Sequence, residues 1–177
     1  MKYIPNILTI LRLLACPILI YLFIFGTYLT ILAIFILACL TDFFDGYLAR
    51  KESLKTNLGK FLDPIADKIL IITMCIMLII NEDISGLHKL AFYIIILREI
   101  IITFLRFNLN NENKNIDVSK LSKYKTFIQM AAIGSILIYH NFELFYFQLP
   151  SIVLVWFSAF ITLFTGIQHL KIYKKLK

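Results

Sequence analysis

The sequence predicts an all-α integral membrane protein with six transmembrane helices in one bundle. Of its 177 residues, 60% are hydrophobic and only 16% are charged, and the mean hydropathy is +0.83. A soluble domain has about 45–50% apolar and about 25% charged residues. Long apolar runs such as 69–80 lack the alternation of apolar and polar residues that strands show, so these runs are predicted to be helices.

Six apolar segments account for the six predicted helices, because a helix needs about 20 apolar residues to cross the hydrocarbon core. The segments are 8–25, 28–49, 61–80, 87–107, 124–139 and 149–173. Polar joints separate them at 26–27, 50–60, 81–86, 108–123 and 140–148. No internal repeat or change in composition divides the chain, so residues 1–177 are predicted to form a single membrane domain.

The distribution of cations predicts how these helices are oriented. Thirteen of the eighteen Lys and Arg residues lie before the first helix, around the second and fourth joints, or in the C-terminal tail, and the opposite side carries only Lys89. By the positive-inside rule, both termini and the Lys-rich joints of this multi-pass protein are predicted to be cytoplasmic. The net charge of +7 is therefore ascribed to topology and to contact with anionic lipids, not to nucleic acid.

Four carboxylates lie inside predicted membrane segments. Asp42 and Asp45 are three residues apart near the end of the second segment, and Asp63 and Asp67 are four residues apart near the start of the third. These spacings place each pair on one helix face, with the two pairs at similar depth. A carboxylate within a spanning helix costs about 2.5–3.5 kcal/mol and usually faces a wet cavity, so the four mark a functional site.

Divalent cations are the simplest compensation for four clustered carboxylates. Hard oxygen ligands suit Mg²⁺ or Mn²⁺, which also coordinate phosphate oxygens, and two such ions can assist an in-line phosphoryl displacement. Gly46 leaves space for a substrate beside Asp45. Ala49 has a small side chain and so leaves space on the same helix face. Arg50 offers a guanidinium group that can bind a diphosphate through two nitrogens.

This pattern resembles the signature of the CDP-alcohol phosphatidyltransferases. The matching positions, with every gap as in the signature, are Asp42, Asp45, Gly46, Ala49, Arg50, Gly59, Asp63 and Asp67. The resemblance implies a homodimer of six-helix chains among membrane lipids, two metal ions held by the four aspartates, and Asp67 as the base. It also implies that CDP-diacylglycerol binds near Asp45, Gly46, Ala49, Arg50 and Gly59.

Residues 6–12, 98–106 and 123–130 resemble the bacterial members of that family that transfer a phosphatidyl group to sn-glycerol 3-phosphate and release CMP. The cations predicted to bind the acceptor phosphate are Arg98, Arg106, Lys123 and Lys125. Two alternatives stay open, because long side chains can also snorkel to the interface and Glu99 can simply neutralise one Arg. Arg12 either borders the cavity or belongs to an interfacial first turn.

Two other functions also stay open. A small cation transporter would place carboxylates in membrane helices too, but an ion path needs polar groups through the whole bilayer. Segments 29–40 and 69–80 hold only Thr30 and Thr73 as polar residues, which argues against such a path. Within the family, the alternative is a cardiolipin synthase, whose acceptor is phosphatidylglycerol.

Overall fold

The computed structural model is all-helical, and the residues that it describes include no strand. Its helices are α1 (Ile4–Phe25), α2 (Tyr28–Lys51), α3 (Asn57–Ile80), α4 (His88–Asn111), α5 (Lys120–Phe142) and α6 (Phe145–Leu176). The structure describes residues 4–51, 57–111 and 120–176, without the side chains of 4–6, 43–51, 57–64, 106, 108–111, 120–123 and 174–176. The predicted all-α class is therefore correct.

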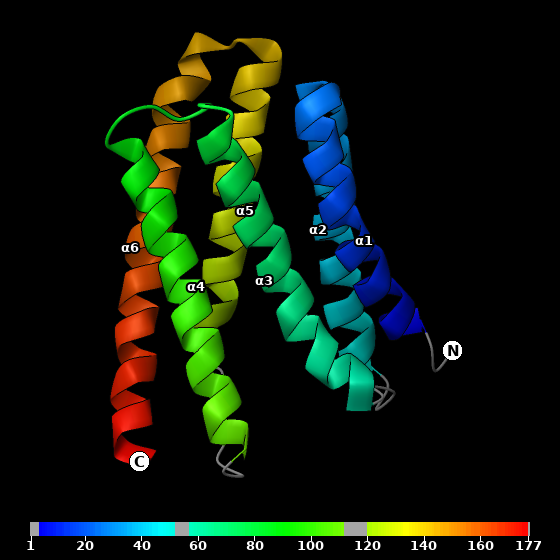
Figure 1. The fold of residues 1–177 in the computed structure, drawn as a ribbon, viewed down its shortest axis with the longest axis vertical. Coiled ribbons are helices and arrows are strands. Elements are labelled where there is room, and N and C mark those ends of the chain that lie inside the picture. The colour runs from blue at the N-terminus through cyan, green and yellow to red at the C-terminus, as the bar shows by residue number, and fades with distance from the viewer. Residues whose placement is uncertain (1–3, 52–56, 112–119, 177) are drawn as a thin grey trace.

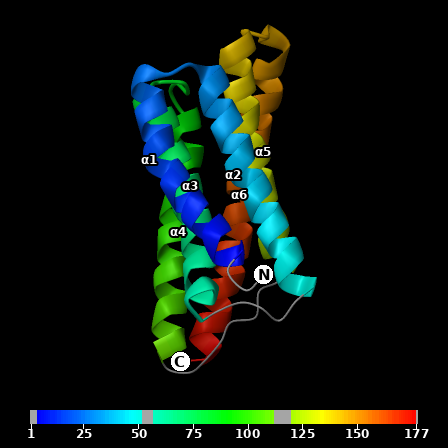
Figure 2. The same ribbon diagram turned by 90° about the vertical axis from the view of Figure 1, so that its right-hand side faces the viewer.

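The six helices run alternately in opposite directions along one bundle (Figure 1). Both chain termini lie at the same end, where α2 and α4 finish and α3 and α5 begin. Helix α3 contacts α1, α4 and α5, while α6 packs against α4 and α5. Helix α2 packs against α1 and α5, as the turned view in Figure 2 also shows. The end of the bundle that carries the termini is the one predicted to be cytoplasmic.

Most joints are shorter than the sequence predicts, and the predicted joint at 140–148 is wrong. Helix α5 continues to Phe142 and α6 begins at Phe145, with Glu143 in a left-handed conformation (φ 50°) between them. Pro150 lies inside α6, where its missing N–H leaves the carbonyl of Tyr146 without its helical donor. Tyr146 is 88% exposed, so solvent can satisfy that carbonyl and the helix continues through the proline.

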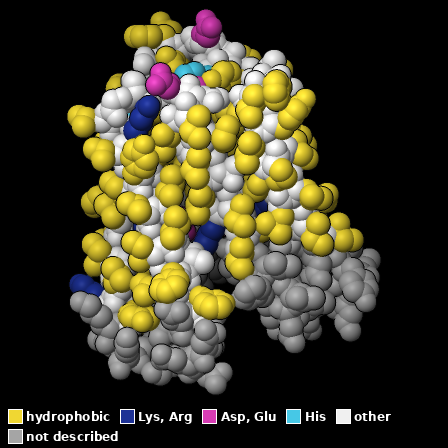
Figure 3. All heavy atoms as spheres, viewed as in Figure 1, with side chains coloured by type: hydrophobic (Ala, Val, Ile, Leu, Met, Phe, Trp, Pro, Cys, Tyr) yellow, Lys and Arg dark blue, Asp and Glu magenta, His cyan; other side chains and the backbone are white. Residues whose placement is uncertain are grey.

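The exposed faces of the helices are apolar, and several polar residues are buried among the apolar core, unlike in a soluble protein. The buried face of α1 includes Thr9, Arg12, Cys16, Leu19 and Phe23, and its exposed face includes Ile10, Leu14, Ile18, Tyr21 and Ile24. Hydrophobic side chains likewise cover much of the face drawn in Figure 3. Such an apolar surface fits a lipid environment. Two of the described helical stretches, Ile7–Phe25 and Phe145–Tyr173, are long and apolar enough to span a bilayer.

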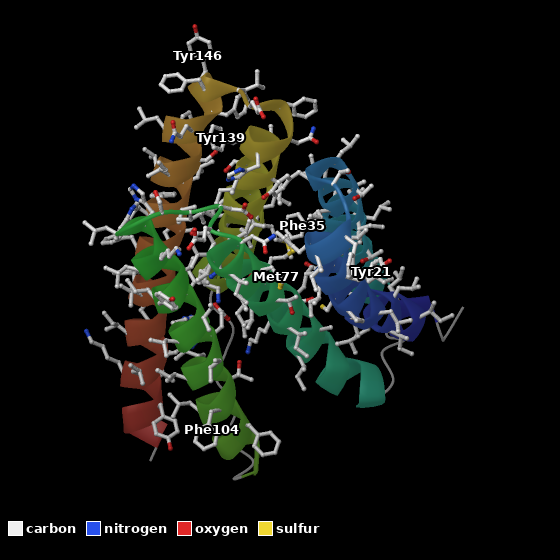
Figure 4. All side chains as sticks on the ribbon, turned by 45° about the horizontal axis from the view of Figure 1, so that its top comes forward. Tyr21, Phe35, Met77, Phe104, Tyr139 and Tyr146 are labelled. Atoms are coloured by element: carbon white, nitrogen blue, oxygen red, sulfur yellow. The ribbon has the colours of Figure 1, made fainter. Side chains whose placement is uncertain are left out.

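Small residues bring α6 close to its neighbours. The buried face of α6 repeats at helical spacing and consists of Ser151, Val155, Ser158, Ala159, Thr162, Thr165 and His169. Small side chains let helix backbones approach closely within a membrane. Larger side chains fill the centre of the bundle, where Figure 4 labels Phe35 and Met77, while Tyr21 and Tyr146 lie at its surface.

At the end of the bundle opposite the termini, a cluster of polar residues connects three parts of the chain. The Tyr28 hydroxyl donates to the Asp83 carboxylate, and His140 Nε2 lies 2.9 Å from the Asp83 carbonyl oxygen. The rings of Tyr28 and His140 stack with their centroids 5.2 Å apart. Burial raises the pKa of Asp83, although the hydrogen bond from Tyr28 and the nearby His140 act in the opposite direction. This cluster ties α2 to α5 and to the α3–α4 joint.

Candidate active site

Asp42 and Asp67 are brought together by two helices that the sequence separates by a joint. Asp42 lies just beyond the middle of α2 and Asp67 near the middle of α3. Both carboxylates contact the same nitrogen, Arg12 Nη1, through their Oδ1 atoms, and the distance from Asp42 is 3.3 Å. The two Oδ1 atoms therefore lie close together, with a single nitrogen between them. The two carboxylates are thus related through Arg12 of α1, which packs against both α2 and α3.

Arg12 reaches the acidic pair from the buried side of α1. Its side chain is 0% exposed, whereas those of Asp42 and Asp67 are 31% and 29% exposed. The Cys16 Sγ lies 3.5 Å from the Arg12 carbonyl oxygen one turn further along. Of the two interpretations left open for Arg12, the one that places it at the site is correct. Thr9, Arg12 and Cys16 are three and four residues apart, so they share one helix face, and that face is buried. This spacing is the sequence feature that indicates an inward-facing Arg12.

The other predicted residues of the acidic motif have a helical backbone, and their side chains lie outside the described residues. They are Asp45, Gly46, Ala49 and Arg50 in α2, and Gly59 and Asp63 in α3. Among the side chains that the structure does describe, no group of three or more His, Cys, Asp or Glu residues is placed to hold a metal ion. The four-aspartate metal centre therefore stays a prediction.

A second polar cluster is buried between α4, α5 and α6, and Glu99 is at its centre. Glu99 is 1% exposed, and its Oε1 accepts from Lys125 Nζ and, at 3.1 Å, from Arg98 Nη1. Gln129 Nε2 lies 3.4 Å from the same oxygen and donates to Thr162 Oγ1 at 2.8 Å. Arg98 and Lys125, both predicted to bind the acceptor phosphate, thus share one carboxylate.

Arg98 extends from this cluster to α6 because α6 has a glycine there. Arg98 Nη2 donates to Thr165 Oγ1 at 3.0 Å. A Cβ atom at Gly166 would lie 3.1 Å from Arg98 Cγ and 3.3 Å from Arg98 Nε, which is too close for an ordinary contact. Gly166 therefore leaves the space through which the guanidinium reaches α6.

Lys68 connects α3, which carries Asp67, with the cluster around Glu99. Lys68 Nζ donates to Thr103 Oγ1 at 2.7 Å, and Thr103 Oγ1 donates to the Glu99 carbonyl oxygen at 2.6 Å. Sequence reasoning assigned no role to Lys68, Gln129 or Thr162. Such residues can be recognised in a sequence where a polar residue shares a helix face with apolar residues that are predicted to be buried.

Arg106 and Lys123 are the other two cations predicted to bind the acceptor. Arg106 belongs to α4 and Lys123 to α5, and both side chains lie outside the described residues. The described site therefore has two parts, a partly exposed carboxylate pair and a buried group of cations. A carboxylate pair can hold hard cations, and a cation group can hold a phosphate.

Comparisons with known proteins agree with this chemistry. The family model of the CDP-alcohol phosphatidyltransferases matches residues 2–164. The chain is 40% identical over 175 residues to a Rickettsia bellii protein named CDP-diacylglycerol–glycerol-3-phosphate 3-phosphatidyltransferase, with 97% of this chain and 95% of the relative covered. Proteins of the same name from Haemophilus influenzae and Bacillus subtilis are 36% and 37% identical. They cover 98% and 77% of this chain, and 95% and 69% of their own length.

Proposed function

We propose that this chain, which belongs to the CDP-alcohol phosphatidyltransferase family, transfers a phosphatidyl group from CDP-diacylglycerol to sn-glycerol 3-phosphate. The products are phosphatidylglycerol phosphate and CMP. Its relatives from Rickettsia, Haemophilus and Bacillus carry the name of this transferase, and similarity to the first two extends over nearly the whole chain. The observation that carries the proposal is the convergence of Asp42 and Asp67 on one side of the bundle.

Asp42, Asp45, Asp63 and Asp67 are the residues that would hold divalent metal, as two Mg²⁺ or Mn²⁺ ions. The described pair fits this role, because carboxylate oxygens from two helices lie close together and are about one-third exposed. When bound, such ions supply charge stabilisation for phosphoryl transfer. Asp67 takes the proton of the acceptor hydroxyl as general base. Asp45, Gly46, Ala49, Arg50 and Gly59 form the binding surface for the CDP moiety of the donor.

The acceptor phosphate binds to the cations of α4 and α5. Arg98 and Lys125 contribute two positive charges against the single carboxylate of Glu99, and Arg106 and Lys123 belong to the same two helices. A phosphomonoester carries nearly two negative charges and forms strong, charge-assisted hydrogen bonds with such groups. Neutral alcohols gain nothing from this charge, so the arrangement favours a phosphorylated acceptor.

The bilayer placement follows the same proposal. All six helices of the single domain span the bacterial inner membrane, with both termini and the acidic site at the cytoplasmic end. The apolar exposed face of α1 and the thirteen cations on one side support this placement. Two chains associate as a homodimer within the membrane lipids.

The experiment that tests the function is an acceptor panel with the purified full-length protein. CMP release and the lipid product are measured with CDP-diacylglycerol and Mg²⁺, using glycerol 3-phosphate, phosphatidylglycerol, glycerol, inositol or serine. We expect glycerol 3-phosphate to give phosphatidylglycerol phosphate and the three neutral or zwitterionic small molecules to be poor acceptors. A preference for phosphatidylglycerol would instead identify a cardiolipin synthase.

A further inference from the structure

Arg12 is the only described cation with ion pairs to both Asp42 and Asp67. It lies beneath them, fully buried, while both carboxylates are partly exposed. Of its three nitrogens, Nη1 makes both contacts, and Nε and Nη2 are buried without a hydrogen-bond partner among the described residues. The pairing of this guanidinium therefore depends on the two carboxylates.

This arrangement balances charge in both directions. A buried cation is costly unless it is paired, and the two aspartates supply its partners. Two neighbouring carboxylates repel each other unless a positive charge lies between them, and Arg12 supplies that charge. Through these ion pairs, α1 is held against α2 and α3 at the acidic site.

We propose that Arg12 is the internal counter-ion of the acidic site and that it opposes the binding of divalent cations. This inference rests on the metal role assigned above to Asp42 and Asp67. A cation that binds these carboxylates meets the like charge of Arg12 at contact distance from the same side chains. The two positive charges are thus alternative partners of the acids. Because such coupling is reciprocal, cation binding must weaken the hold of Arg12 by the same factor.

Arg12 is in this view a positioning residue with two effects. It holds the two carboxylates close together before a cation arrives, and it lowers the affinity of the assembled site. A residue that merely fills space beneath the acids would have neither effect. The two roles can be distinguished by measuring how replacement of Arg12 changes cation affinity, and how its effect on stability differs with and without the cation.

The test compares Arg12→Met, which keeps the length of the side chain without its charge, with Arg12→Lys, which keeps the charge. Binding of Mn²⁺ alone to the purified full-length protein is measured by titration calorimetry. We expect Arg12→Met to bind Mn²⁺ at least about tenfold more tightly than the wild type, since a nearby like charge is removed. Arg12→Lys should stay near the wild-type affinity. Arg98→Met is the matched control, because it removes a buried guanidinium paired with Glu99 instead.

Thermal unfolding provides a second readout. The midpoint of Arg12→Met should fall further below the wild type in chelator than in saturating Mn²⁺, because the cation then replaces the missing charge. If Arg12→Met does not fold, Arg12→Gln takes its place under the same expectations. Unchanged or weaker Mn²⁺ binding, or an equal loss of stability in both conditions, overturns the proposal. If the wild type itself binds no Mn²⁺, the metal assignment is wrong and the inference fails with it.

Discussion

Replacing Glu99 by Gln tests whether this carboxylate holds the buried cations of α4 and α5 together. The wild-type Oε1 accepts from Lys125 and Arg98, with Gln129 at 3.4 Å, and the side chain is almost completely buried. The variant keeps the shape and one accepting oxygen but removes the negative charge. Two buried cations are then left without their counter-ion.

The expected loss of stability follows from that geometry. Breaking a buried ion pair by removing one partner costs about 3–5 kcal/mol. In a chain of this length each kcal/mol corresponds to about 2–4 °C in the unfolding midpoint, so we expect a decrease on the order of 10 °C. Thermal unfolding of the purified protein measures it. Glu143→Gln, the same chemical change at an exposed position, is the control and should shift the midpoint little.

The same variant also tests the assignment of the acceptor site. Two uncompensated cations should bind a phosphomonoester more tightly, so glycerol 3-phosphate should raise the midpoint of Glu99→Gln more than that of the wild type. A variant as stable as the wild type would refute the role of Glu99 as counter-ion. A variant that is destabilised but gains nothing from glycerol 3-phosphate would place the acceptor phosphate elsewhere.

Three further outcomes are expected. Arg98→Ala should raise the KM for glycerol 3-phosphate at least about a hundredfold and that for CDP-diacylglycerol far less, in steady-state assays with each substrate varied; an unchanged acceptor KM would contradict this role. Activity should be lost in chelator and fall at least about 100-fold in Asp63→Asn, measured as CMP release, whereas full turnover in chelator would exclude a metal requirement. Reporters fused after Lys177 and within 111–115 should both be cytoplasmic, and a periplasmic signal from either would contradict the six-span topology.

Local patterns were sufficient to predict the helices and the acidic motif. Apolar segment length predicted all six helices, and the boundary at 25–28 is correct at both ends. The acidic pattern predicted that Asp42 and Asp67 lie at similar depth, and both carboxylates contact Arg12 Nη1. These inferences succeed because hydropathy and helical spacing are properties of neighbouring residues. The joint at 140–148 was predicted wrongly because its limits follow the polar residues His140 and Gln148, and both of these lie within helices.

Only the tertiary structure decided which charges neutralise each other. Asp67 and Arg12 are 55 positions apart, and Glu99 and Lys125 are 26 apart, so no local spacing relates them. The sequence left open whether Glu99 pairs with a cation and whether Arg12 belongs to the site. The packing of α1 against α2 and α3, and of α6 against α4 and α5, resolves both questions. Burial inside the bundle is the physical reason, because a charge removed from water needs a partner that only another helix can bring to it.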